Sequence, residues 1–257
     1  MKLFFSPHYV LAAHSFDTTR KAAWLAESLQ QAPIAGVDIL PPAPLTPEEV
    51  AAIHAPAYVD AVRTGRPRGL ATSMGFSWDS GLWPMVLSSN GGVVAAVRAA
   101  LTDGVAGSLS SGLHHARAEH GAGFRTFNGL ALAARAALDA GPRRVLILYL
   151  DEHCGGGTCS LLVGDDATWR LDVAVSRFDR YTPGPQQRLA VVDDAADYLA
   201  TINDELTSIA ASAPGFDLCH YNAGMDSYER CDIGGLPGIS ADILEQREEL
   251  VFDWCRR

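Results

Sequence analysis

The run VLILYLD at 145–151 constrains the fold of this chain more than any other feature. A strand that is apolar on both faces belongs inside a parallel sheet covered by helices on both sides. Two further runs, LDVAVS at 171–176 and FDLCHYNAG at 216–224, have the same character. They alternate with stretches of helical periodicity. The pattern predicts one domain over residues 1–257, a three-layer α/β/α structure with a central, mostly parallel sheet.

Capping signals predict where several helices begin. Asp17 and Asn128 are expected N-caps, and Thr46 followed by Pro47 and Glu49 has the pattern of a capping box. Two more strands are expected at 2–6 and 105–110. Helices are expected at 17–31, 92–101, 129–140, 195–211 and 241–256.

Composition narrows the class of protein. Apolar residues make up 48% and charged residues 19% of the 257 residues, which excludes a disordered or coiled-coil chain. The net charge of -10 repels phosphate backbones, so we expect no nucleic-acid partner. The 5 cysteines are irregularly spaced without a CxxC pair, which argues against a disulfide framework. There is no secretory signal and no run of about 18 apolar residues, so we expect a cytoplasmic protein that does not enter a membrane.

Chemically reactive residues follow the ends of three predicted strands. The loops are SGLHHARAEHGAGF after 105–110, EHCGGGT after 145–151 and MDSYERCD after 216–224. In open α/β sheets, ligands bind outside the carboxyl ends of the strands. Three such loops predict a functional site at this edge.

Asp151, His153 and Asp226 are the candidate metal ligands. Asp151 and His153 lie two residues apart at a strand end, so their side chains point to the same side and can approach one ion. The alternatives are a turn cap beside an ordinary loop histidine, and for Asp226 a cap on the next helix. One histidine with two carboxylates suits a catalytic Zn²⁺, with Fe²⁺ or Mn²⁺ as alternatives, and leaves a coordination position open.

His114 and His115 form a tandem pair in a glycine-rich loop. Three interpretations are open: a second metal site, a general acid–base pair, or two surface histidines. Imidazole suits proton transfer near neutral pH. Downstream, Gly123 would let the backbone approach a substrate closely, and Phe124 would place one aromatic wall beside it.

Together these segments resemble the histone deacetylase superfamily, which includes acetoin-utilisation proteins, acetylpolyamine amidohydrolases and bacterial deacetylase-like proteins and shares the arginase fold. The resemblance extends from about residue 1 to the chain end. It is carried by GLHHA (112–116), GAGFRTFN (121–128), LDEHCGGGT (150–158) and NAGMD with GGL (222–236), and by the scaffold segments 14–21, 53–62 and 89–101.

The resemblance implies a Zn²⁺ ion held by Asp151, His153 and Asp226, with His114 and His115 as the acid–base pair and His115 as the preferred general base. The implied reaction removes an acetyl or other acyl group from an amine such as acetyl-lysine or acetylpolyamine. The metal would polarise the amide carbonyl and lower the pKa of water. Two other functions are weighed: a metal-binding but catalytically weakened domain that binds acyl-amines, and an arginase-like two-manganese hydrolase. The last is disfavoured because the ligands of only one metal are recognisable.

The resemblance also implies roles outside the metal ligands. Gly123 and Phe124 would line the narrow channel for the acylated chain, and Asp79 would face the channel mouth. Ser176 and Arg177 match part of a site for a monovalent cation, K⁺ or Na⁺.

Two acidic residues that hydrogen-bond the tandem histidines in the family are replaced in this chain. Tyr149 and Gly156 stand at their positions. The orientation of the histidines therefore depends on other groups. Candidate carboxylates are those of Glu152, Glu119 and Asp232.

The family's last strand and its Gly-Gly-Tyr loop are also expected to be missing. The tyrosine of that loop stabilises the oxyanion, yet no tyrosine follows Tyr228. Losing one such donor costs on the order of a hundredfold in turnover. We expect one of three situations: the sequence is a fragment, another group supplies the oxyanion donor, or the protein is a weakened hydrolase. A sheet that ends early exposes an edge, which predicts a homodimer or a fragment that tolerates the exposure.

Overall fold

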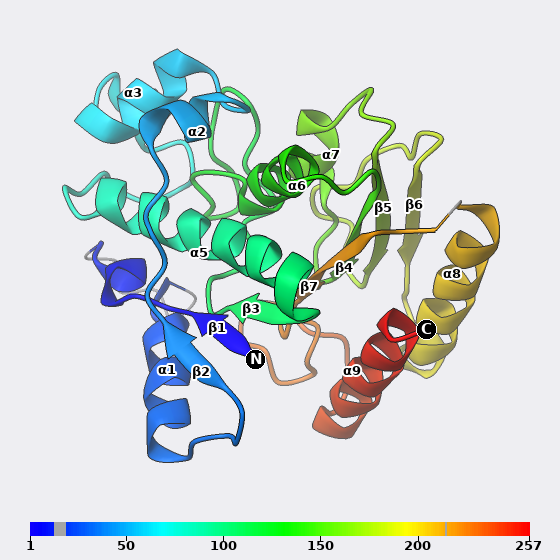
Figure 1. The fold of residues 1–257 in the computed structure, drawn as a ribbon. Coiled ribbons are helices and arrows are strands. Elements are labelled where there is room, and N and C mark those ends of the chain that lie inside the picture. Colours follow the sequence, from blue (N-terminus) through cyan, green and yellow to red (C-terminus); the bar gives the residue numbers. More distant parts are fainter. Residues whose placement is uncertain (13–18, 214) are drawn as a thin grey trace. The chain divides into compact units, whose positions relative to one another are not determined.

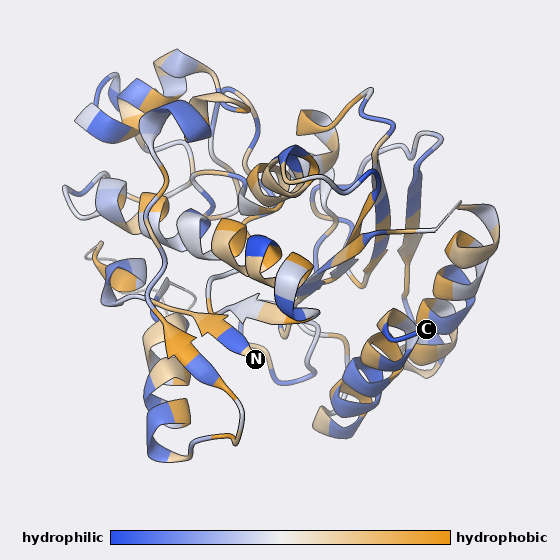
Figure 2. Ribbon diagram, in the orientation of Figure 1, coloured by the Kyte–Doolittle hydropathy of each residue, from blue (hydrophilic) through white to orange (hydrophobic). Residues whose placement is uncertain are grey.

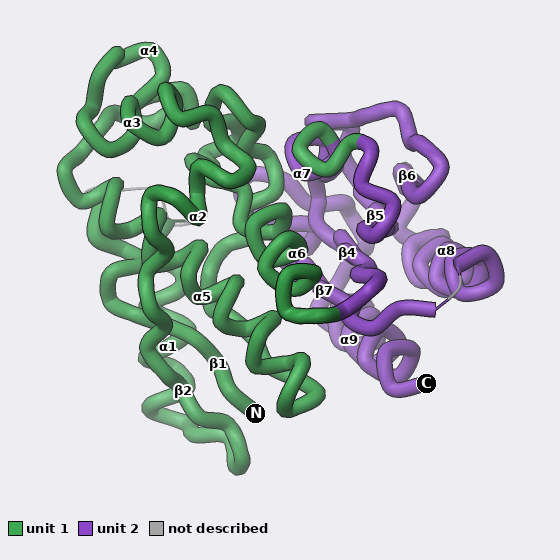
Figure 3. Tube along the Cα trace, turned by 45° about the horizontal axis from the view of Figure 1, so that its top comes forward, with its two compact units in different colours: residues 1–141, 160–163 green, residues 142–159, 164–257 purple. Residues whose placement is uncertain are grey.

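The computed structural model describes residues 1–12, 19–213 and 215–257. The chain divides into two compact units (Figure 3): residues 1–141 with 160–163 form unit 1, and residues 142–159 with 164–257 form unit 2. That both belong to one domain stays a prediction. The predicted N-cap Asp17 and most of the scaffold segment 14–21 lie outside the described residues.

Unit 1 contains a parallel sheet of three strands in the order β2 (Asp38–Leu40), β1 (Lys2–Phe4), β3 (Ala106–Ser108). The chain passes from the central β1 to one side for β2 and to the other side for β3, so the order reverses at β1. The loop with the tandem histidines begins beyond β3. The helices of this unit are α1 (Lys21–Gln31), α2 (Pro47–Ala51), α3 (Pro56–Thr64), α4 (Arg68–Ala71), α5 (Leu82–Asp103) and α6 (Gly129–Asp139), with a 3-10 turn at Pro7–Val10.

Two of the predicted caps in unit 1 are confirmed. The Thr46 hydroxyl accepts the amide of Glu49 at 3.2 Å, and the Glu49 carboxylate accepts the amide of Thr46 at 2.8 Å. The Asn128 side chain accepts the amide of Ala131 at 3.0 Å and so begins α6. Each cap supplies an acceptor to amides that the first helical turn leaves unbonded.

Helix α5 begins at Leu82, well before the predicted start at 92. The buried polar residues Ser89 and Asn90 interrupt the apolar pattern there, but both donate to the carbonyl of Val86, Asn90 at 2.7 Å. By length and composition α5 is apolar enough to cross a membrane, a test that core helices of soluble proteins also pass. The expectation that the protein does not enter a membrane stays a prediction.

Unit 2 contains a parallel sheet of four strands in the order β6 (Gln187–Val191), β5 (Thr168–Ala174), β4 (Val145–Leu150), β7 (Leu218–Ala223) (Figure 1). Every residue of β4 is buried, as the apolar run predicted. The chain leaves β4 for β5 on one side, while β7 pairs on the other. The boundary between β4 and β7 is therefore the topological switch point, where α/β sheets place their ligands.

Helices α8 (Tyr198–Ser212) and α9 (Ala241–Cys255) bury an apolar face in the core of unit 2. Figure 2 shows hydrophobic and hydrophilic residues alternating along both helices, as expected for helices with one buried side. A 3-10 turn (Ala195–Asp197) precedes α8, and residues 156–159 of the short α7 (Gly156–Leu161) also belong to this unit. The core comprises Leu146, Leu148 and Leu150 of β4, Leu171 and Val173 of β5, Ile202, Leu206 and Ile209 of α8, and Leu244 and Val251 of α9, among others.

The outermost strands β7 and β3 each have one pairing partner within the described part of the chain. There, β7 pairs only with β4, and β3 pairs only with β1. The expected exposed edge, and the homodimer that it suggested, stay predictions.

Candidate functional site

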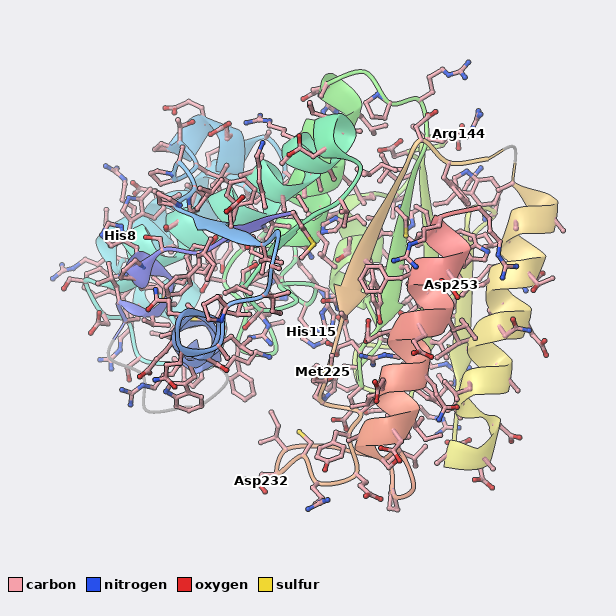
Figure 4. All side chains as sticks on the ribbon, turned by 60° about the horizontal axis from the view of Figure 1, so that its bottom comes forward. His8, His115, Arg144, Met225, Asp232 and Asp253 are labelled. Atoms are coloured by element: carbon pink, nitrogen blue, oxygen red, sulfur yellow. The ribbon has the colours of Figure 1, made fainter. Side chains whose placement is uncertain are left out.

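The three predicted metal ligands converge at the switch point of unit 2. Nδ1 of His153 lies 3.4 Å from Oδ1 of Asp151 and 3.5 Å from Oδ2 of Asp226. One ligand atom from each residue lies within 4.8 Å of the other two. In Figure 4, Met225 marks this end of the sheet beyond β7, and Arg144 marks the opposite end. A nitrogen and two carboxylate oxygens at this spacing are a donor set that suits Zn²⁺ or a similar divalent ion.

The two carboxylates control the protonation of His153. Burial opposes its charge, but hydrogen bonds and attraction to Asp151 and Asp226 outweigh burial and raise the pKa of His153 from 6.5 to about 10. A metal ligand must be a neutral imidazole. A metal that binds here at neutral pH must therefore displace a proton from His153.

The carboxylates of Asp151 and Asp226 also accept hydrogen bonds from backbone amides in the loop after β4. Oδ1 of Asp226 accepts the amide of Glu152 at 2.9 Å, and Oδ1 of Asp151 accepts the amide of His153 at 3.1 Å. The first bond ties the loop after β7 to the loop after β4. The alternative role for Asp226, a cap on the next helix, is wrong, because Ser240 is the N-cap of that helix, α9.

Two further carboxylates, those of Asp172 and Asp179, hold the glycines that follow His153. Asp172 Oδ2 accepts the amide of Gly155 at 2.7 Å, and Asp179 Oδ2 accepts the amide of Gly157 at 2.9 Å. The amide of Gly156 donates to the Asp179 carbonyl at 3.1 Å. A loop whose amides all have fixed acceptors holds its ligand in one position.

These carboxylates lie where the sequence lacks the expected acids. A Cβ atom on Gly156 would lie 2.6 Å from Oδ1 of Asp179 and closer still to its backbone carbonyl oxygen, so the backbone and side chain of Asp179 together fill the space of a side chain at 156. Asp172 is the register partner of Tyr149 on the neighbouring strand. The sequence interpretation missed both residues. A charge inside the apolar strand at 171–176 was a usable signal for Asp172, whereas Asp179 had none.

The three carboxylates that the sequence suggested as replacements have different surroundings, and their role toward the histidines stays a prediction. Glu152 is buried and its Oε2 accepts the amide of Gly235 at 3.1 Å, while burial raises its pKa. A Cβ atom on Gly234 would overlap this carboxylate, which explains the Gly-Gly pair. Glu119 and Asp232 are exposed.

The tandem histidines of unit 1 are both buried, so the interpretation as two surface histidines is wrong. Their ring centroids lie 3.9 Å apart at an interplanar angle of 57°. The Asn128 side chain that caps α6 also donates to the carbonyls of His114 and Ala116, each at 3.0 Å. Among the described residues, the group formed by Asp151, His153 and Asp226 is the only set of three or more with metal-ligand spacing. The acid–base and second-metal interpretations of the pair both stay predictions.

His54, within the scaffold segment 53–62, supports the same loop. Its Nδ1 lies 2.9 Å from the Arg117 carbonyl, and its Nε2 accepts the amide of Asn128 at 3.0 Å. Burial lowers the pKa of His54 to about 4, so the ring is neutral, with its proton on Nδ1. The sequence interpretation did not single out this residue, which lies in the turn between α2 and α3, since a lone histidine there carries no sign of its partners.

Gly123 and Phe124 follow in the same unit with left-handed backbones, φ 52° and 65°. The Phe124 ring is 43% exposed and stacks on Phe76 at 5.1 Å between centroids. That Gly123 and Phe124 line a substrate channel stays a prediction; if they do, Phe76 adds a second ring to the aromatic wall.

Gly123→Ala is expected to displace His115 and to destabilise the protein. A Cβ at 123 would lie 2.8 Å from Cγ of His115 and closer still to its Cδ2. Such overlap costs about 1–3 kcal/mol of unfolding free energy. The matched control is Gly36→Ala, also at positive φ but with no atom within 4 Å of the new Cβ. Urea unfolding and the NMR shift of the His115 imidazole are the measurements; equal losses in both variants, with an unmoved His115 signal, would contradict the packing role.

The two residues predicted for a monovalent cation have other partners in the structure. The Ser176 hydroxyl accepts the amide of Phe178 at 3.2 Å, and the Ser176 carbonyl accepts the Cys154 thiol at 3.3 Å. Arg177 forms a two-pronged ion pair with Asp193, both contacts at 2.7 Å. The K⁺ or Na⁺ site stays a prediction.

Asp79, which was expected at a channel mouth, has a structural role. Its Oδ1 accepts the amide of Gly81 at 2.6 Å, in the turn that leads into α5.

Comparison with known proteins identifies the family. The model of the histone deacetylase domain matches residues 14–181. Histone deacetylase 2 of Arabidopsis thaliana is 33% identical over 173 residues, which are 65% of this chain and 44% of that protein. The chain belongs to the histone deacetylase family, as the motifs predicted, and the match spans less than half the length of this relative.

Solved structures show the same fold. The crystal structure of the HDA15 HD domain superposes with a TM-score of 0.81 at 19% identity and covers 99% of this chain and 80% of that one. The acetylpolyamine aminohydrolase of Burkholderia pseudomallei gives a TM-score of 0.79 at 19% identity, covering 98% and 89%. The predicted α/β class with parallel strands, in the arginase/deacetylase fold, is confirmed.

Proposed function

We propose that this chain is a zinc-dependent amidohydrolase that removes an acetyl or other acyl group from an amine. The observation that carries the proposal is the group formed by Asp151, His153 and Asp226 at the switch point of a deacetylase fold. Acetylated lysines and acetylpolyamines are the substrate class, in line with the names of the relatives. The net charge of -10 favours amines that carry other positive charges.

Within this proposal, the metal ligands and the tandem histidines have different roles in the reaction. Asp151, His153 and Asp226 would hold the zinc, which would supply Lewis acidity for the amide carbonyl and for water. His115 takes a proton from the attacking water, and His114 supplies one to the leaving amine nitrogen. Both functions require a fixed loop, and Asn128 holds the backbone carbonyl of His114 while His54 holds the amide of Asn128.

The second candidate is a domain that binds zinc and an acyl-amine without hydrolysing it. Tyr149 favours it, because a fully buried phenol replaces an acid two residues before a ligand. Burial is the main cause that raises the pKa of Tyr149, so it supplies no negative charge.

Purified protein loaded with zinc is expected to contain one ion per chain and to hydrolyse an acetyl-lysine peptide or an acetylpolyamine. Chelation should abolish turnover and zinc should restore it; Fe²⁺ and Mn²⁺ are tested alongside as alternative ions. Tight binding of a hydroxamate with no turnover on either substrate would favour the second candidate. Absence of stoichiometric metal would overturn both.

A further inference from the structure

Arg247 of α9 is fully buried, with 0% of its surface exposed. A buried guanidinium is expensive unless all its donors find acceptors. Its Nη1 donates to the Gly224 carbonyl at 2.7 Å and to the Leu150 carbonyl at 3.1 Å. One nitrogen thus reaches two neighbouring strands at once.

These two carbonyls belong to the strand ends that carry the metal ligands. Leu150 is the last residue of β4 and directly precedes Asp151, and Gly224 lies just beyond β7, two residues before Asp226. Carbonyls at the carboxyl end of a sheet have no further ladder partner, so their direction depends on what they meet there. Here both meet the same guanidinium.

The remaining contacts fix the guanidinium plane. Nε and Nη2 both donate to Oε1 of Glu248, Nε at 2.9 Å, and Nη1 lies 3.3 Å from the Tyr198 hydroxyl. Glu248 is held in turn by the Tyr221 hydroxyl at 3.1 Å. The position of Arg247 is therefore set by α8, α9 and β7 together.

We propose that Arg247 is a positioning residue of the metal site, which clamps the ends of β4 and β7 so that Asp151 and Asp226 face one ion before it binds. The proposal rests on the metal site of the proposed function, but it does not depend on hydrolysis. Supports of metal ligands, when removed, typically weaken metal affinity 10–100-fold. Lysine cannot replace this planar fork, since its single ammonium has no fixed geometry for several acceptors.

The test measures the zinc dissociation constant by competition with a chromogenic chelator for Arg247→Met and Arg247→Lys. Loss of affinity of up to about a hundredfold is expected for the methionine variant and about tenfold for the lysine variant. If the methionine variant does not fold, the lysine variant decides, with amide exchange of the metal-free protein at 151–153 and 224–226 as a second readout. That exchange is expected to accelerate.

Two control variants separate clamping from general stability. Glu245→Gln changes an exposed carboxylate on the same helix and leaves the clamp intact, so its zinc affinity should stay within about twofold of wild type. Arg170→Met removes another buried arginine, on β5, whose Nη1 binds Thr168 at 3.1 Å. Wild-type zinc affinity in Arg247→Lys, or an equal loss in Arg170→Met at matched melting temperature, would overturn the proposal. An inactive wild type that still binds zinc would refute hydrolysis alone.

Discussion

Asp226→Ala is expected to abolish stoichiometric zinc binding. The change removes one of three ligands and also the acceptor that ties the Glu152 amide to the loop after β7. Since loss of a mere support weakens affinity by 10–100-fold, loss of a ligand should exceed about a hundredfold. The measurements are metal analysis after gel filtration and chelator competition.

Two companion variants make this result specific. Asp226→Asn keeps an acceptor for Glu152 but loses the charge, so it should preserve the fold and still lose most of the affinity. Asp232→Ala changes an exposed carboxylate in the same loop and should bind zinc normally. Zinc that stays fully bound to Asp226→Ala would show that the ligand assignment is wrong.

Asp172→Asn is expected to change how stability depends on pH. Burial raises the pKa of Asp172 from 3.8 to about 8, although the hydrogen bond from the Gly155 amide acts to lower it. Between these values the folded protein holds a proton that the unfolded chain does not. The wild-type free energy of unfolding therefore falls as pH rises through this window, by up to about 1.4 kcal/mol per pH unit. Asparagine stays neutral, so the variant lacks this slope.

The comparison is made by urea unfolding of the metal-free proteins at about pH 5 and about pH 9. The variant should be the more stable protein at both pH values, and its advantage should be clearly larger at the higher pH. Asp217→Asn is the control, because backbone amides of Arg143 and Arg144 lower the pKa of that exposed carboxyl below this window. Parallel profiles for wild type and Asp172→Asn would refute the role of burial at Asp172.

Local signals predicted much of the fold. The apolar run at 145–151 gave the central strand, and the side-chain chemistry of Thr46 and Asn128 gave the starts of two helices. The short strands β2 and β6 were missed, since a few residues at a sheet margin carry little periodic pattern. The first half of α5 was missed because its buried polar groups bond within the helix.

The metal ligands were predictable because they follow strand ends, where chain topology places chemistry. Their supports were not. Arg247 lies far along the chain from Asp151. A charged residue in a helix is expected at the surface, and only the structure shows that Arg247 is buried. Asp179 bonds the glycine loop only because its own segment returns to that loop.

The surroundings of Gly156 also limit which residues this position can accept. A Cβ there would overlap the backbone carbonyl oxygen of Asp179 and would lie 2.6 Å from its Oδ1. A shorter side chain at 179 would relieve only the second overlap. Any side chain at 156 therefore requires the backbone at 179 to move, so the choice of glycine is tied to the path of the segment that follows β5.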